Sequence, residues 1–145
     1  MVAGCSGRLA PLEFPWRSSR KPMPAATRKT IAIVDDDRLL REALQDLLEA
    51  EGFESHLYAC AEAFLSQFDA RPVDCIVADV RMTGMSGIDM LGILQAKPHC
   101  PPVLIMTSYG DARMEGRALS GGATAFLAKP LDSRKLIACI RKAVA

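Results

Sequence analysis

Polar side chains that could bind a metal ion or take part in a reaction lie where apolar segments of this sequence end. Asp35 and Asp36 directly follow one apolar run, and Asp79 follows a second. Thr107 and Lys129 follow two more. Neighbouring carboxylates repel one another unless a cation compensates them, and oxygen ligands suit Mg²⁺. A carboxylate can also attack phosphorus, while a lysine and a hydroxyl bind phosphoryl oxygens. Brought together, these five residues could hold Mg²⁺ and accept a phosphoryl group.

The surrounding pattern predicts elements that would bring these residues together. Short apolar, β-branched runs alternate with stretches of helical periodicity, and polar or Gly/Pro-containing turns separate them. We expect strands at Thr30–Val34, Phe53–Tyr58, Val73–Ala78, Pro102–Met106 and Thr124–Leu127. We expect helices from the cap Asp37 to the stop at Gly52, and at Ala61–Phe68, Ser86–Lys97, Asp111–Leu119 and Asp132–Ala143. Strict alternation implies an α/β fold, namely a doubly wound parallel sheet of five strands with helices on both faces.

In a doubly wound sheet, ligands bind at the carboxyl ends of the strands. Each candidate residue has an ordinary structural explanation when it is taken alone. An aspartate after a strand often caps a helix, a threonine there is commonly a turn residue, and Lys129-Pro130 could be a plain loop. Their joint occurrence at the ends of four expected strands, on one side of the sheet, favours a shared site.

The first 29 residues differ from the rest in composition. Residues 1–29 contain four prolines and carry six basic and one acidic side chain, whereas residues 30–145 carry twelve basic and sixteen acidic ones. We therefore expect a disordered basic leader at 1–29 and a single domain at 30–145. The acidic balance of the domain argues against direct nucleic-acid binding by it.

Two further features bear on the compartment of the protein. No apolar run approaches the ~20 residues that cross a bilayer, so we expect no membrane association. The five cysteines include no pair at C-x-x-C spacing, which argues against a zinc site or a disulfide framework. A reducing cytoplasm fits this cysteine usage. His56 and His99 show no ligand spacing and are interpreted as ordinary surface or loop residues.

Four sequence blocks together carry a resemblance to a known family. They are Ile-Val-Asp-Asp-Asp at 33–37, Asp-Val-Arg-Met-Thr-Gly-Met-Ser-Gly at 79–87, Ile-Met-Thr-Ser at 105–108 and Phe-Leu-Ala-Lys-Pro at 126–130. In this order and at these spacings, residues 30–144 resemble the receiver domain of bacterial two-component response regulators. The residues of these four blocks are most similar to those of the nitrogen-fixation regulator subfamily. The resemblance implies the flavodoxin-like strand order 2-1-3-4-5 of chemotaxis regulators.

The resemblance also implies a metal and a role for each site residue. Asp79 would be the phospho-acceptor, and Mg²⁺ would be bound by Asp35, Asp36, Asp79 and the backbone carbonyl of Arg81. Thr107 and Lys129 would contact the phosphoryl group.

A switch and a set of partners follow from the same resemblance. Thr107 and Phe126 would move together on phosphorylation, and the Lys129–Pro130 bond would be cis. The partner would be a sensor histidine kinase or a phosphotransfer protein. A homodimer would form through the face that carries residues 111–119, strand 124–127 and residues 132–143. Such a domain is a signalling module and not an enzyme.

The sequence departs from the family pattern at the loop after Asp79. Thr83 stands where proline is usual, which predicts a looser loop and altered metal affinity or switching. Arg81 and Tyr109 flank the expected phosphoryl site, and we hypothesise that these large side chains slow dephosphorylation by obstructing water. The sequence leaves open whether this is a stand-alone receiver or part of a longer regulator.

Three other classes of protein compete with a phospho-accepting receiver. A haloacid-dehalogenase-like phosphatase needs Asp-x-Asp after its first strand, where this chain has three consecutive aspartates. A flavodoxin-like nucleotide binder needs a Gly/Ser/Thr-rich phosphate loop there, and three aspartates would repel a phosphate. A degenerate receiver that acts as a phosphorylation-independent dimerisation or scaffold module stays open, and metal and phosphodonor binding would separate it from an active one.

Overall fold

The fold was examined in a computed structural model, which describes residues 28–108 and 112–145. The strands are β1 (Thr30–Val34), β2 (Glu54–Tyr58), β3 (Cys75–Asp79), β4 (Val103–Thr107) and β5 (Ala125–Ala128). The helices are α2 (Arg38–Ala50), α3 (Ala61–Gln67), α4 (Gly87–Gln95), α5 (Ala112–Ser120) and α6 (Ser133–Val144). The leader predicted at 1–29 falls almost wholly outside the described residues, as do Tyr109 and Asp111.

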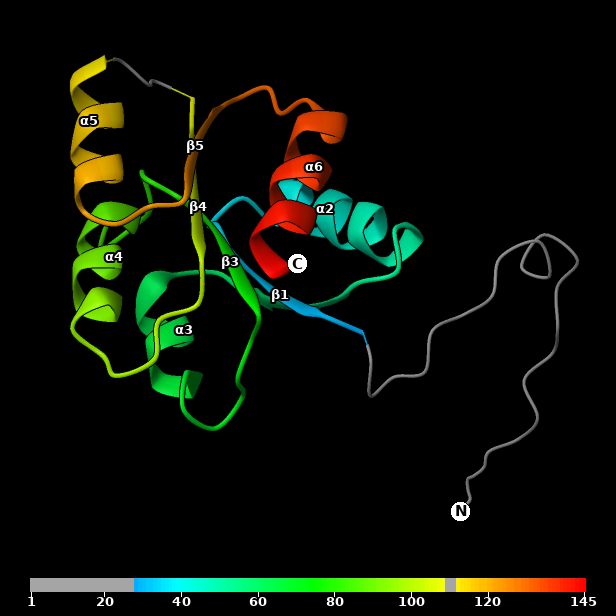
Figure 1. The fold of residues 1–145 in the computed structure, drawn as a ribbon, viewed down its shortest axis with the longest axis horizontal. Helices are drawn as coiled ribbons and strands as arrows, with labels where there is room; N and C mark the ends of the chain where they lie inside the picture. The colour runs from blue at the N-terminus through cyan, green and yellow to red at the C-terminus, as the bar shows by residue number, and fades with distance from the viewer. Residues whose placement is uncertain (1–27, 109–111) are drawn as a thin grey trace, which may run out of the picture.

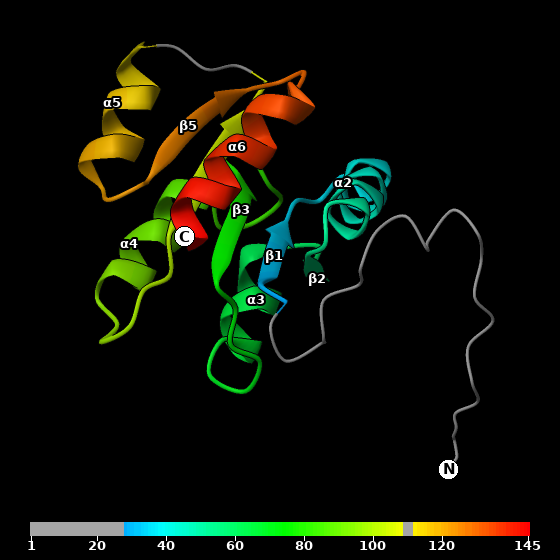
Figure 2. The ribbon, with the colours of Figure 1, turned by 45° about the vertical axis from the view of Figure 1, so that its right-hand side comes forward.

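The strands form one parallel sheet in the order β2-β1-β3-β4-β5, which confirms the predicted α/β class and strand order. Helices α3, α4 and α5 cover one face of the sheet, and α2 and α6 cover the other (Figure 1). The turned view in Figure 2 shows the strands running side by side between these two layers. The carboxyl ends of β1, β3, β4 and β5 therefore meet at one edge.

The core consists of two apolar layers, one on each face of the sheet. One layer joins alternate strand residues to α3 and α4, with Phe64 and Leu91 fully buried in it. The other joins the remaining strand residues to α2 and α6 and includes Leu48 and Ile140. Strands β3 and β4 are buried along their whole length, as continuous apolar runs in parallel sheets are.

The observed boundaries differ from the predicted ones by one or two residues. Asp37 caps α2 as predicted, because its Oδ1 accepts hydrogen bonds from the N–H groups of Leu39 and Leu40. Strands β3 and β4 each run one residue further than predicted, so Asp79 and Thr107 are the last residues of their strands. The ladder continues beyond Asp79, since Val80 N–H donates to the carbonyl of Met106 at 3.0 Å.

The interpretation of His56 as an ordinary surface or loop residue was wrong. His56 lies in β2 beside Ala32 of β1, and its Nδ1 is buried without a hydrogen-bond partner among the described residues. Burial, followed by the charge of Arg71, lowers the pKa of this imidazole.

Within the described ranges, no helix has the length and apolar character of a membrane span.

Candidate functional site

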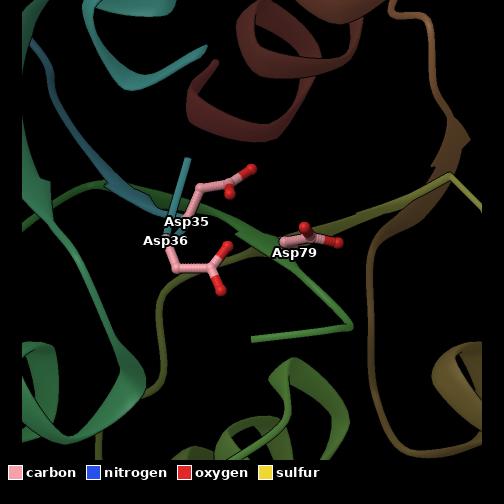
Figure 3. A group of neighbouring side chains, drawn as sticks. All are labelled: Asp35, Asp36 and Asp79. Atoms are coloured by element: carbon pink, nitrogen blue, oxygen red, sulfur yellow. The ribbon is translucent and has the colours of Figure 1, made fainter. Parts of the chain in front are cut away.

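Three aspartates come together at the carboxyl edge of the sheet. Asp35 and Asp36 follow β1, and Asp79 ends β3, so the pairing of these two strands places them side by side (Figure 3). One carboxylate oxygen from each lies within 4.8 Å of the others. Asp35 is fully buried and Asp79 is 7% exposed, whereas Asp36 is exposed. The sequence prediction that these acids converge is confirmed.

Lys129 bridges the two buried acids. It follows β5, and its Nζ donates to Asp35 Oδ2 at 3.0 Å and to Asp79 Oδ2 at 2.9 Å. Burial acts to lower the pKa of Lys129, but the hydrogen bonds that it donates to Asp79 and Asp35 outweigh burial and raise that pKa above its usual value. The ammonium therefore stays charged and holds the ends of β1 and β3 together.

Three hydrogen bonds fix the backbone and the side chain of Asp35. Its N–H donates to the carbonyl of Tyr58 at 3.1 Å, and its carbonyl accepts from Arg41 Nη1 at 2.7 Å. Its Oδ1 accepts the N–H of Asp37 at 2.9 Å. Burial raises the pKa of Asp35, and the hydrogen bonds from Asp37 and Lys129 oppose that rise. A cation at this carboxylate would relieve the burial cost in the same way as the lysine does.

Asp79 lies under the N-terminus of α4. Its Oδ1 accepts the N–H of Arg81 at 3.3 Å. Gly87, the first residue of α4, donates its N–H to the carbonyl of Val80 at 3.0 Å. A side chain at Gly87 would collide with the backbone carbonyl of Asp79, so glycine is required for this close approach.

The loop after Asp79 makes hydrogen bonds at Thr83, and the looser loop and altered metal affinity expected there stay a prediction. The Thr83 N–H and hydroxyl donate to Asp36 Oδ2 at 3.2 and 3.4 Å. Glu62 of α3 accepts the N–H of Met85 at 3.1 Å through its Oε2. Gly84 lies between these two contacts with φ +86°, a conformation that favours glycine. Polar contacts therefore connect this loop to Asp36 and to Glu62.

Of the other predicted site residues, Thr107 and Lys129 lie at this edge, and Phe126 lies within β5. Thr107 is fully buried at the end of β4, and its carbonyl accepts the N–H of Lys129 at 2.8 Å. Phe126, in β5, is half-buried and packs against the core layer on the α3–α5 side. The Lys129–Pro130 bond is cis, as predicted. Arg81 is exposed, and the role of its carbonyl as a ligand stays a prediction.

Sequence reasoning missed Arg41 and Glu62, which act on the site from two helices. Arg41 lies six residues after Asp35 and Glu62 lies twenty-three residues before Met85. Each looks like a solvating charge on an exposed helix face, and no local pattern distinguishes it from its neighbours.

The described residues fit a hard divalent cation. Three carboxylates supply oxygen donors, and they include no sulfur or imidazole ligand. An acidic pocket with a lysine, at the carboxyl edge of a sheet in the order β2-β1-β3-β4-β5, defines a receiver-type signalling module.

Comparison with known proteins leads to the same class. The family model of the response regulator receiver domain matches residues 31–141. The chain therefore belongs to the response regulator receiver family.

Individual relatives support this assignment. The chain is 38% identical over 118 residues to the transcriptional regulatory protein FixJ of Bradyrhizobium diazoefficiens, covering 81% of this chain and 58% of that protein. It is 30% identical over 138 residues to the response regulator protein TodT of Pseudomonas putida, covering 95% of this chain and 60% of that protein. A crystal structure of FixJ-N superposes with a TM-score of 0.75 at 32% identity, covering 81% of this chain and 94% of that one.

The chain spans little more than half the length of the curated relatives that it matches. The receiver family is thus established for this part, and the activity and partners of a whole regulator are a separate question.

Proposed function

We propose that this chain is a phospho-accepting receiver in a two-component phosphorelay. The observation that carries the proposal is the geometry of Lys129, whose ammonium bridges Asp35 and Asp79 beside Asp36. The phosphoryl donor is a phosphohistidine of a sensor histidine kinase or a phosphotransfer protein. A carboxylate oxygen of Asp79 attacks phosphorus as the P–N bond of the donor breaks, and the bonding electrons leave with the imidazole nitrogen.

Mg²⁺ is the metal that this donor set suits best. Asp35, Asp36, Asp79 and the backbone carbonyl of Arg81 would hold it, with water in the remaining positions. When bound, Mg²⁺ supplies positive charge next to the transferred phosphoryl oxygens.

The side chains around Asp79 orient it and bind the transferred phosphoryl group. Lys129 orients the Asp79 carboxylate through a hydrogen bond to its Oδ2, and a second hydrogen bond to Asp35 holds the ammonium in place. Once the acyl phosphate forms, Lys129 is within reach to bind one phosphoryl oxygen, and Thr107 offers a hydroxyl for another.

Phosphorylation would be transmitted through Phe126. Its ring lines a groove of about 560 Å³ together with Glu115 of α5, Leu127 of β5 and Lys135 of α6. A shift of Thr107 toward the phosphoryl group frees space in the core layer against which Phe126 packs, and the groove changes shape with it. A local change of charge thereby reaches the surface.

A second copy of this chain is the partner that the α5–β5–α6 face suits. Acidic Glu115 and Asp132 line the groove together with basic Lys135, and Leu131 adds an apolar surface. A two-fold symmetric dimer brings one patch against itself, so a patch with both charges is self-complementary. We infer that phosphorylation favours this homodimer.

Several wider properties follow as proposals. The module signals and is not itself an enzyme, and its acidic domain does not bind nucleic acid directly. A reducing cytoplasm suits the free cysteines of the described residues, namely Cys60, Cys75, Cys100 and Cys139. Slow dephosphorylation through Arg81 and Tyr109 stays a hypothesis, and Tyr109 lies outside the described residues.

The experiment that tests the proposal is intact-protein mass spectrometry after incubation with Mg²⁺ and acetyl phosphate. The wild-type protein should gain one phosphoryl group, and neither Asp79→Asn nor a chelated wild-type sample should gain it. A wild type that gains nothing and fails to bind Mg²⁺ would replace this function with the phosphorylation-independent scaffold.

A further inference from the structure

Thr83, in the loop after β3, makes two hydrogen bonds to Asp36, which follows β1. Its N–H and its hydroxyl both donate to Asp36 Oδ2, at 3.2 and 3.4 Å, across 47 residues of sequence. Asp36 is the exposed member of the acidic group, whereas Lys129 secures the two buried ones. The loop after β3 therefore fixes the one carboxylate that the lysine does not reach.

The position of these bonds on Asp36 has a chemical consequence. Both engage Oδ2, so the carboxylate retains Oδ1 for a cation held with Asp35 and Asp79. An exposed aspartate samples several rotamers, and a metal that binds it must restrict them. Hydrogen bonds that restrict the ligand in advance reduce this entropic cost of metal binding.

The loop that carries Thr83 has a second anchor. Glu62 Oε2 accepts the N–H of Met85 at 3.1 Å and lies 2.8 Å from the point where a side chain on Gly84 would begin. The segment 83–85 is therefore tied to β1 through Asp36 and to α3 through Glu62. Because the hydrogen bond between Met85 and Glu62 anchors the loop, Thr83 can restrict the movement of the Asp36 side chain.

We propose that Thr83 is a positioning residue that presents Asp36 to Mg²⁺, an inference that rests on the proposed phospho-acceptor function. Its hydroxyl and N–H orient the carboxylate in the metal-free protein and strengthen metal binding. Thr83 does not contact the reacting atoms, so it sets the concentration of Mg²⁺ that the reaction needs and leaves the rate at saturating Mg²⁺ unchanged.

The test compares Thr83→Val with the wild type in two assays. Valine keeps the shape and the N–H but loses the hydroxyl. One exposed hydrogen bond corresponds to roughly a two- to tenfold change in an equilibrium constant. The hydroxyl contact is long, at 3.4 Å, so we expect a value at the lower end: Mg²⁺ titration by calorimetry should give a Kd raised about twofold. The Mg²⁺ concentration for half-maximal phosphorylation by acetyl phosphate should rise by the same factor, with an unchanged maximal rate.

Two further variants separate positioning from a general effect on the fold. Thr83→Ser restores the hydroxyl and should restore the wild-type Kd. Thr124→Val removes the hydroxyl of an exposed threonine far from the acids and should leave the Kd unchanged.

Three outcomes would overturn the inference. Equal Mg²⁺ affinity of Thr83→Val and wild type would show that the hydroxyl does not prepare Asp36. Tighter binding by Thr83→Val would show that Thr83 competes with the metal. A wild type that neither binds Mg²⁺ nor accepts a phosphoryl group would overturn the proposed function itself, and this inference with it.

Discussion

Replacing Lys129 with methionine removes the charge that holds the buried acids together. Methionine is similar in length and has no charge, so the change isolates the ammonium group. Two carboxylates, of Asp35 and Asp79, would then face each other with side chains that are 0% and 9% exposed. We expect the metal-free protein to lose a large part of its stability.

The size of the loss follows from the two contacts. Each N···O distance is about 3 Å, and Coulomb's law at an effective dielectric constant of about 20 gives roughly 5 kcal/mol per contact before desolvation is subtracted. Removing one partner of a buried pair costs about 3–5 kcal/mol. The Lys129 side chain is 16% exposed, which places the expected loss near the lower value, about 3 kcal/mol. For a domain of this size that corresponds to a fall in Tm of roughly 10 °C.

Urea denaturation with and without Mg²⁺ measures the effect. Without metal, Lys129→Met should lose about 3 kcal/mol of unfolding free energy. With saturating Mg²⁺ the loss should shrink, because the metal compensates the same carboxylates. Lys142→Met removes an exposed lysine from the end of α6 and should change stability by less than about 0.5 kcal/mol. A loss below about 1 kcal/mol, or an equal loss with and without Mg²⁺, would refute this electrostatic reasoning.

Two more predictions concern a surface and a buried thiol. Lys135→Glu, in the groove of the α5–β5–α6 face, should abolish phosphorylation-dependent dimerisation in sedimentation velocity, whereas Lys142→Glu should not; equal dimerisation of both would place the interface elsewhere. Burial raises the pKa of Cys75 from 9.0 to about 12, so this thiol stays protonated at neutral pH, and stability falls as the pH rises from about 9 through 12, where only the unfolded state loses the proton. Alkylation at pH 8 followed by peptide mapping should label the partly exposed Cys60 in the folded protein and Cys75 only after unfolding, and equal labelling rates of these two would contradict this.

The fold could be predicted from sequence because its local signals agree with one another. Apolar runs such as the first four residues of β4 form strands that are buried on both faces, and caps such as Asp37 mark where helices begin. Boundaries were less certain because the end of a strand depends on its neighbour. The predicted end of the third strand fell at Ala78, yet pairing with Met106 extends β3 to Asp79.

The sequence predicted the site residues at the strand ends but missed the helix residues that support them. Strand ends must converge in a parallel sheet, so the positions of Asp35, Asp79 and Lys129 followed from topology. The tethers from Arg41 and Glu62 depend instead on rotamers and loop paths that have no short-range signature. Thr83 is an example, because its deviation from proline drew attention to the loop while its hydrogen bonds to Asp36 could be seen only in the structure.

The central claim is that Asp79 itself carries the phosphoryl group. Treating the phosphorylated protein with borohydride reduces the acyl phosphate to an alcohol, which converts the modified aspartate into homoserine. Peptide mapping by mass spectrometry then locates the modified position. The account predicts homoserine at position 79, and none at position 35 or 36, in samples that received both Mg²⁺ and acetyl phosphate. Homoserine at another aspartate, or unmodified Asp79 in a protein that has gained a phosphoryl group, would contradict it.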